Sequence, residues 1–246
     1  MQISVLNTVI GNKALTLIAG PCVIENKNIC YQVAETAKRA GVHVMEAFMW
    51  RFHGQHLRAR KAIENGEIGS LRLVRAAFSW LMPRRPNVRL IPELAGGSVM
   101  DLGCYPISAA RFYFGQEPAM AFAQGSFDPE YRVDMQMAGV LGFGQGQALI
   151  DCSFSLPYRT ELELVGESGV ITIPRAWAPD PEATLIINGK TEKLPNENQY
   201  IDEFEHFSKR IESGSAPLYG PEDAIRQMKV VDAVRRSMES SRAEAV

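Results

Sequence analysis

The sequence has no long apolar run, no marked excess of charge of either sign and few cysteines. No apolar run approaches the ~20 residues of a membrane-spanning helix, and the N-terminus lacks the basic stretch and apolar core of a signal peptide. The 26 basic and 28 acidic side chains give a net charge of -2, which argues against nucleic acid or an anionic membrane as a partner. We therefore expect a cytoplasmic protein.

The four cysteines are scattered along the chain. Cys22, Cys30, Cys104 and Cys152 show none of the close spacings that zinc sites use. We expect four free thiols and no metal site. The 246 residues, 46% of them apolar, suffice for a substantial core in one large domain or two small ones.

One stretch, residues 95–111, combines features that are uncommon in a plain scaffold. Two glycines open it, and Asp101 and Tyr105 follow four residues apart, so a helix would present a carboxylate beside a phenol. Pro106 cannot donate a hydrogen bond to the carbonyl of Leu102, which predicts a kink or break at Tyr105. The alternative is an amphipathic helix with a solvated Asp101 and a half-buried Tyr105.

This stretch resembles the G-G-(G/S)-x-x-x-D-x-G-C-Y segment of the Gfo/Idh/MocA oxidoreductase family, in its dihydrodiol and xylose dehydrogenase branch. The resemblance runs from about Ala37 to near the C-terminus. It includes A-G-V-H-V-M-E-A-F-M-W-R-F-H at residues 40–53, G-E-I-G at 66–69 and R-L-I-P-E-L-A-G-G at 89–97. It implies an α+β fold with a large, mostly antiparallel sheet, helices packed on one face, and a homodimer interface on the open face.

The resemblance also implies hydride transfer between NADP or NAD and a carbon of a sugar or diol. Tyr105 would be the catalytic proton donor or acceptor for the substrate oxygen, and Asp101 would orient the substrate hydroxyls or tune the pair that it forms with Tyr105. A free tyrosine has a pKa near ~10, so it needs a nearby positive charge to work at neutral pH. The family supplies it from the lysine of an E-K-P motif and from the cofactor ring. Where E-K-P is expected, this chain has A-G-P at residues 19–21.

Three further side chains are candidates for substrate binding. Glu46 and Arg51 fall on a segment that is a strand entering the second domain in the family, where Arg51 and His53 share strand parity. Arg89 lies in the loop before the glycines, which borders the substrate in the family. The alternatives are an ion pair between Arg51 and Glu46, a surface position for Arg89 and a solvated His53, and for His53 we favour the solvated position.

Residues 1–36 resemble a different family. I-G-N-K-A-L-T-L-I-A-G-P-C-V-I-E-N, at residues 10–26, is similar to the N-terminus of 3-deoxy-octulosonate 8-phosphate synthase, a TIM-barrel aldolase. In metal-dependent members of that family the Cys of G-P-C is a metal ligand, and Cys22 holds this position. One thiolate makes no metal site. We therefore predict an aldolase-like βα segment over 1–36, joined near Thr36 to an oxidoreductase substrate-binding and dimerisation domain over 37–246.

Periodicity predicts the remaining elements. A strand at 15–19, a helix at about 29–40 and a strand at 42–48 would form a right-handed βαβ crossover. Helices are also expected at 55–65, 198–213 and 221–240, and strands at 71–81, 119–127, 132–141, 147–156, 160–167, 170–173 and 183–188. G-F-G-Q-G at 142–146 is predicted to be a hairpin turn.

Several aromatic and terminal residues also receive a predicted place. Tyr200, Phe204, Phe207 and Ile211 recur at helical spacing, which favours core packing. Trp177, which lies among prolines, is predicted to be a lid or edge aromatic residue. The last helix should turn Met228 and its apolar neighbours inward, and residues 242–246 should fray.

Three functional hypotheses follow. The first is an NAD(P)-dependent oxidoreductase acting on a sugar or diol, represented by its substrate domain, because the Rossmann domain and its G-x-G-x-x-G motif are absent from the sequence. The second is a non-catalytic domain that dimerises or binds a small polyol. The third is an aldolase-type synthase that requires a divalent metal and phosphoenolpyruvate. Nucleotide binding distinguishes the first from the second.

Overall fold

A nine-stranded sheet forms the centre of the molecule. The structure is a computed structural model that describes residues 3–5, 8–10, 35–83, 87–178, 183–195 and 198–246. The strand order is β10-β9-β8-β7-β3-β6-β5-β4-β11. β3 and β6 are parallel, and every other neighbouring pair is antiparallel. The predicted large, mostly antiparallel sheet is confirmed.

All seven strands predicted between residues 71 and 188 are present. Their bounds, with those of the two further strands, are β3 Leu71–Ser79, β4 Met120–Phe127, β5 Asp134–Phe143, β6 Gly146–Ser153, β7 Leu162–Gly166, β8 Val170–Ile173, β9 Ala183–Ile187, β10 Lys190–Leu194 and β11 Glu244–Ala245. The C-terminus was predicted to fray. Instead β11 pairs with the edge strand β4, which supplies its backbone partners.

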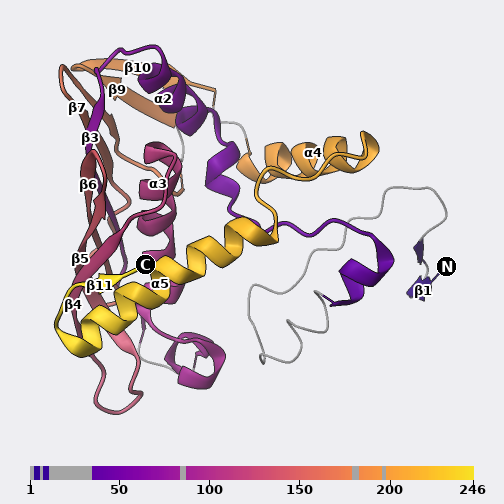
Figure 1. Cartoon of the computed structure of the whole chain (residues 1–246), viewed down its shortest axis with the longest axis horizontal. Coiled ribbons are helices and arrows are strands. Elements are labelled where there is room, and N and C mark those ends of the chain that lie inside the picture. The colour runs from indigo at the N-terminus through magenta and orange to yellow at the C-terminus, as the bar shows by residue number, and fades with distance from the viewer. Residues whose placement is uncertain (1–2, 6–7, 11–34, 84–86, 179–182, 196–197) are drawn as a thin grey trace.

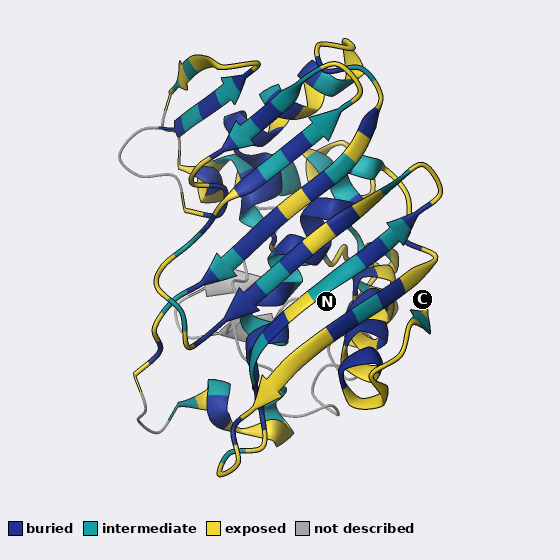
Figure 2. Cartoon of the chain, turned by 90° about the vertical axis from the view of Figure 1, so that its left-hand side faces the viewer, coloured by how far each residue is buried: buried dark blue, intermediate teal, exposed yellow. Residues whose placement is uncertain are grey.

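Helices cover one face of the sheet and leave the other face open (Figures 1 and 2). α3 (Cys104–Phe114) and α5 (Pro221–Ser240) pack against the strands, and α2 (Gly54–Glu64) packs near one end. α4 (Gln199–Glu212) stands away from the sheet and packs on the short 3-10 helix η1 (Met49–Phe52). The helices predicted at 55–65, 198–213 and 221–240 are thus confirmed.

Only parts of the N-terminal segment lie within the described residues. A hairpin of β1 (Ile3–Val5) and β2 (Thr8–Ile10) is present, and residues 35–40 are helical. The strand predicted at 15–19, both N-terminal cysteines and most of the predicted helix lie outside the described residues. Residues 42–48 were predicted to be a strand, but they are irregular and lead into η1. None of the described strands lies beside this segment, so its backbone lacks the hydrogen-bonded partner that a strand requires.

The core lies between the sheet and its helices, and Trp177 is at its centre. Trp177 was predicted to be a lid or edge residue, but it is only 1% exposed. Its indole Nε1 donates to the carbonyl of Ala77 at 3.0 Å, which ties the chain after β8 to β3. Arg175 and Ala178 on either side are exposed, so within this segment Ala176 and Trp177 are the residues that turn inward.

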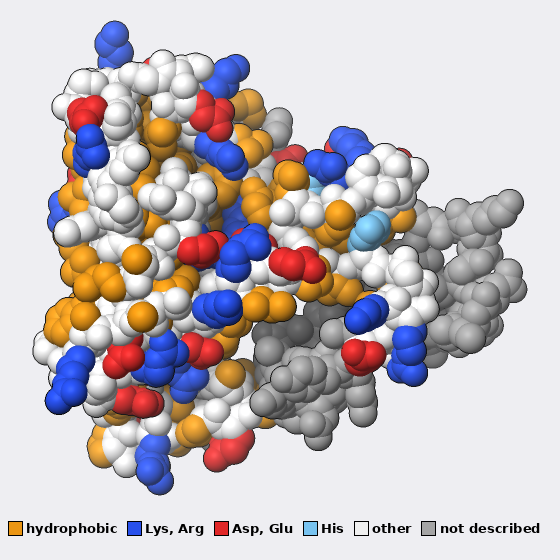
Figure 3. Space-filling view, viewed as in Figure 1, with side chains coloured by type: hydrophobic (Ala, Val, Ile, Leu, Met, Phe, Trp, Pro, Cys, Tyr) orange, Lys and Arg blue, Asp and Glu red, His pale blue; other side chains and the backbone are white. Residues whose placement is uncertain are grey.

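A buried network of charged side chains joins η1, α3 and α5. The Arg51 side chain, 2% exposed, donates to Asp223 at 2.5 Å and to the hydroxyl of Ser108 at 2.6 and 3.1 Å. Arg111 donates to the other oxygen of Asp223 at 2.8 Å and makes a bidentate pair with Glu117. Figure 3 shows the acidic and basic side chains that gather along α5.

We predict that Arg111→Met lowers the free energy of unfolding by about 1–3 kcal/mol, because it removes one of the partners of the buried Asp223 and the bidentate partner of Glu117. Arg226→Met is the matched control. Arg226 reaches Glu117 at 3.2 Å, but its side chain is 49% exposed, so its loss should cost less than about 1 kcal/mol. Urea denaturation of both variants measures the difference, and equal losses would contradict the structural role of the network.

Candidate functional site

The candidate site starts at two glycines that admit no side chain. A Cβ on Gly96 would lie 2.7 Å from the carbonyl oxygen of Arg89 and 2.8 Å from that of Ile91. A Cβ on Gly97 would fall on the carboxylate of Asp134, and the φ of Gly97 is +116°. Backbone hydrogen bonds from Gly96 to Ile91 and from Gly97 to Arg89, at 3.0 and 2.9 Å, close the loop. Glycine is therefore required at both positions.

Asp134, the first residue of β5, anchors this loop to the sheet. It is buried, and its Oδ2 accepts from the hydroxyl of Ser98 and from the backbone N–H of Val99, both at 2.7 Å. Val99 begins the helical segment, so the carboxylate serves an N–H group that has no partner within the helix. Sequence reasoning missed Asp134, because its partners lie 35 and 36 residues earlier in the chain and no local motif joins them.

The helix after the glycines begins as a π-helical turn. This turn, η4 (Val99–Gly103), runs directly into α3. The kink or break predicted at Tyr105 is wrong. Pro106 lies in the first turn of α3, and the wider π turn before it accommodates the missing N–H, so the irregularity precedes Tyr105.

Two of the predicted site residues, Asp101 and Arg89, form an ion pair. The Nε of Arg89 lies 2.6 Å from Oδ2 of Asp101, and the two side chains are 38% and 27% exposed. The guanidinium of Arg89 also lies 5.9 Å from the ring centroid of Trp80. The pair therefore combines hydrogen-bond donors and acceptors at a partly exposed position.

Tyr105 is held by aromatic neighbours. Its ring centroid lies 5.4 Å from that of Phe48 and 5.2 Å from that of Phe78, both edge to face, and 5.8 Å from that of Trp177. Its hydroxyl lies 3.9 Å from Sδ of Met49 on η1. The ring is thus fixed on three sides, as a side chain that must present one atom to a ligand requires.

Glu46 and Arg51 do not pair with each other, since Arg51 is taken up by Asp223 and Ser108. Burial raises the pKa of Glu46, although the nearby Arg51 guanidinium lowers it. Oε2 of Glu46 is buried and has no hydrogen-bond partner in the described part of the chain. The solvated position favoured for His53 is wrong. This residue is fully buried, and its Nδ1 accepts from the N–H of Gln55 at 3.2 Å as the N-cap of α2.

α4 exposes most of the side chains that were predicted to pack in the core. Tyr200, Phe204 and Ile211 are 48%, 39% and 39% exposed. The face of α4 that packs inward instead carries Gln199 and Glu203, and burial raises the pKa of Glu203 to about 7. Helical spacing defines a stripe but not the direction in which it points. Met228 on α5 likewise points outward, against prediction.

The described residues give no sign of a metal site or a membrane span. They contain no group of three or more His, Cys, Asp or Glu placed to hold a metal ion. Within the same residues, no helix is long and apolar enough to cross a bilayer. Cys104 and Cys152 are both free, and burial raises the pKa of each thiol.

Neither described glycine cluster fits a dinucleotide. Residues 142–146 include the turn between β5 and β6, as predicted. Gly96 and Gly97 do precede a helical segment, but Asp134 already occupies the N–H group at its start, where a pyrophosphate would need free donors. The carboxylate of Asp134 would therefore repel a phosphate at this position.

Comparison with known proteins gives consistent relatives. The GFO/IDH/MocA C-terminal domain family matches residues 56–172. The chain is 34% identical over 219 residues to D-xylose 1-dehydrogenase (NADP(+)) 2 of Haloferax volcanii, covering 86% of this chain and 67% of that protein. It is 30% identical over 166 residues to trans-1,2-dihydrobenzene-1,2-diol dehydrogenase of Xenopus tropicalis, covering 66% of this chain and 49% of that protein.

A solved structure shows the same architecture. The aldose-aldose oxidoreductase from Caulobacter crescentus, complexed with glycerol, superposes with a TM-score of 0.80 at 25% identity. The superposition covers 88% of this chain and 68% of that one. The nine-stranded sheet with helices on one face is therefore shared with an oxidoreductase.

We predict that Gly97→Ala lowers the free energy of unfolding by about 1–3 kcal/mol or more, because it combines a strained φ with a clash against Asp134. Gly144→Ala is the matched control, since its Cβ would meet no atom within 4 Å. Thermal unfolding of the two variants distinguishes them. If Gly97→Ala were as stable as Gly144→Ala, the contact between Gly97 and Asp134 would be disproved.

A second prediction concerns the buried carboxyl of Glu203. Because its pKa is raised from 4.5 to about 7 in the folded state, the folded protein binds an extra proton between these values. Its stability should therefore fall as the pH rises through this window, by up to about 3 kcal/mol. Glu203→Gln should remove this part of the pH dependence, and the exposed Glu212→Gln should not. Equal pH profiles for both variants in urea denaturation would contradict the burial of Glu203.

Proposed function

This chain belongs to the Gfo/Idh/MocA family, and from that premise we propose that it is the substrate side of an NAD(P)-dependent oxidoreductase that acts on a hydroxyl group of a sugar or diol. The observation that carries the proposal is the position of Tyr105. Its ring is fixed by three aromatic neighbours, and it follows the Asp101–Arg89 pair by one helical turn. The relatives are dehydrogenases of a sugar and of a diol, whose reacting groups are hydroxyls.

In the proposed reaction Tyr105 transfers a proton between its Oη and the substrate oxygen. Asp101 accepts hydrogen bonds from neighbouring substrate hydroxyls, and Arg89 both orients Asp101 and donates to substrate oxygens. The hydride belongs to the chemistry of the nicotinamide cofactor, for which NADP is the candidate named in the xylose dehydrogenase relative. The described residues do not fit a dinucleotide, so no step of its binding is assigned to them.

Glu46 and Arg51 have different parts in this proposal. Glu46 retains a buried oxygen without a partner, and this oxygen is available to accept a hydrogen bond from a substrate hydroxyl. Arg51 is 2% exposed and satisfied by Asp223 and Ser108, so we assign it to positioning η1, which carries Met49 beside Tyr105.

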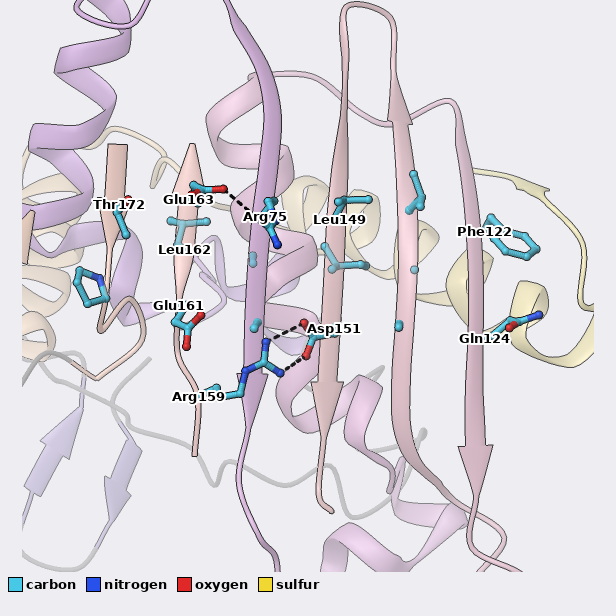
Figure 4. Close-up of a pocket in the computed structure, with 17 residues that line it drawn as sticks. Arg75, Phe122, Gln124, Leu149, Asp151, Arg159, Glu161, Leu162, Glu163 and Thr172 are labelled. Carbon is cyan, nitrogen blue, oxygen red and sulfur yellow. Dashed lines mark hydrogen bonds and ion pairs between the residues drawn. The ribbon is translucent and has the colours of Figure 1, made fainter. Parts of the chain in front are cut away.

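The open face of the sheet supports a second role, homodimerisation. It contains a hollow of about 790 Å³ across β3, β5, β6 and β7 (Figure 4). Arg159 makes a bidentate pair with Asp151 at 2.8 and 3.2 Å, and Arg75 pairs with Glu163 at 3.2 Å on the neighbouring strand. Leu149 remains 40% exposed beside them. A face with both charge signs and apolar area suits a second copy of itself across a two-fold axis.

The proposed activity predicts a specific effect of Tyr105→Phe. We expect kcat for the oxidation of D-xylose and of diols to fall at least ~100-fold, because the hydroxyl that transfers the proton is gone. The reaction is measured by the accompanying reduction of NADP. The free energy of unfolding should change little, since the ring and its contacts remain. Tyr158→Phe, at a side chain that is 51% exposed, is the control and should leave both quantities unchanged.

A melting-temperature series with saturating NADPH and, separately, NADP comes first. Ligand at ~100 times its dissociation constant stabilises a protein by ~2.7 kcal/mol, which gives a readily measured shift. No shift and no turnover would contradict oxidoreductase activity of this chain by itself and favour the dimerising or polyol-binding domain, which sedimentation and titration with glycerol then test. Turnover that requires a divalent metal and phosphoenolpyruvate would instead support the aldolase.

A further inference from the structure

A second hollow, of about 190 Å³, is rich in arginine. It lies between α2, α3 and the start of α5, and none of Tyr105, Asp101 and Arg89 lines it. Its charged lining consists of Arg51, Arg60, Arg111, Arg226, Glu117 and Asp223. Arg51, Arg111 and Asp223 hold η1 against α3 and α5, but no proposed contact with the oxidoreductase substrate lies in this hollow. Arg60 and Arg226 beside them call for a separate explanation.

The charges that line the hollow do not cancel. Asp223 is shared by Arg51 and Arg111, at 2.5 and 2.8 Å, and Glu117 is shared by Arg111 and Arg226, at 2.6 and 3.2 Å. The guanidinium groups of Arg51 and Arg111 hold the pKa of Asp223 below its usual range in spite of burial, so its charge persists at neutral pH. Four cations against two anions leave an excess of two positive charges in the lining.

The fourth arginine has its own acidic neighbour outside the lining. Arg60 pairs with Glu64 at 3.0 Å along α2, with side chains 48% and 61% exposed. A pair this exposed is held weakly in water, so Arg60 can exchange Glu64 for a better acceptor. Even with Glu64 counted, the hollow keeps an excess of positive charge.

The arginines divide into two fixed and two adjustable groups. The side chains of Arg51 and Arg111 are 2% and 5% exposed, so their charges are fixed behind the two carboxylates. Arg60 on α2 and Arg226 on α5 are about half exposed. Because Asp223 and Glu117 balance Arg51 and Arg111, the positive excess lies with Arg60 and Arg226, the two donors that can close on a ligand.

The hollow also has aromatic walls. Phe112 and Tyr219 line it, with Arg60 5.0 Å from the ring centroid of Phe112 and Arg51 4.5 Å from that of Tyr219. A Cβ at Gly115, which also lines the hollow, would meet no atom within 4 Å. The site therefore offers apolar contact beside its donors and open space at its edge.

We propose that this hollow binds the phosphate group of a small phosphomonoester. A phosphomonoester carries about -1.5 to -2 charges at pH 7, so the excess of positive charge in the lining attracts it. Arginine is suited to phosphate because its planar fork can donate two parallel hydrogen bonds. Arg60 and Arg226 donate to the phosphate oxygens, and the organic part of the ligand lies against Phe112 and Tyr219.

Isothermal titration at constant ionic strength tests this with three probes. Phenyl phosphate should bind more tightly than inorganic phosphate because its ring contacts the aromatic walls, and phenol should not bind measurably. Arg226→Gln and Arg60→Gln should each weaken the binding of phenyl phosphate by about tenfold or more, since each removes a charge-assisted hydrogen bond. Arg235→Gln is the control, because Arg235 is exposed on the same helix as Arg226 but does not line the hollow.

Three outcomes would overturn the proposal. The first is that phenyl phosphate does not bind the unmodified chain. The second is that phenol binds as tightly as phenyl phosphate, which would show apolar contact alone. The third is that Arg235→Gln weakens binding as much as Arg226→Gln, which would show unspecific attraction to basic side chains. Unchanged melting temperatures of the variants establish that a loss of binding reflects the site, and neither the probes nor the readout involve a nucleotide or turnover.

Discussion

The carboxylate of Asp134 is the contact on which the candidate site depends. It joins the first residue of β5 to Ser98 and Val99, where the helical segment with Asp101 and Tyr105 begins. A buried carboxylate is stabilised there because it accepts two hydrogen bonds and lies at the positive end of a helix. This placement excludes a side chain at Gly97 and a phosphate at the same N–H group. One interaction therefore fixes the geometry of the site and determines which ligands it rejects.

Tyr105 is positioned by a second, independent constraint. The Arg51–Asp223–Arg111 network holds η1 against α3 and α5, and η1 places Met49 beside the hydroxyl of Tyr105. Buried ion pairs contribute little net stability compared with apolar packing, but they fix relative orientation because a displaced charge is costly. The network therefore keeps the orientation of η1 relative to α3 and α5 constant beside the phenol of Tyr105.

Sequence reasoning predicted the elements in which the spacing of apolar residues matches the residues that are buried. β8 and β9 alternate between a covered and an open face, and α5 buries Val231, Val234 and Met238 of its predicted stripe although Met228 points outward. Asp101 and Arg89 were recognised through family resemblance, and the structure brings them together. The origin of residues 1–36 as a separate segment stays a prediction.

The wrong predictions share one cause, which is that burial depends on neighbours distant in sequence. Trp177 lies among prolines, but the carbonyl of Ala77, a hundred residues earlier, accepts its indole N–H. His53 was predicted to be solvated, yet it is buried and caps the predicted helix, where its Nδ1 accepts from the N–H of Gln55. The apolar stripe of α4 points outward because Gln199 and Glu203 occupy the side that faces η1. In each case the local sequence indicated an element or a residue type, but which side chains are buried was decided by contacts with other parts of the chain.

The open face of the sheet shows how a surface can suit both water and a partner. Arg75 and Glu163 are direct cross-strand neighbours on β3 and β7, and Arg159 holds Asp151 on β6. In water each pair contributes only about 0–1 kcal/mol, so the pairs do little for the single copy. When a second copy covers them, however, each charge already has its counterion within the same chain, so burial leaves no charge uncompensated. Exposed apolar area such as Leu149 can then supply the attraction, while the ion pairs fix the relative orientation of the two copies.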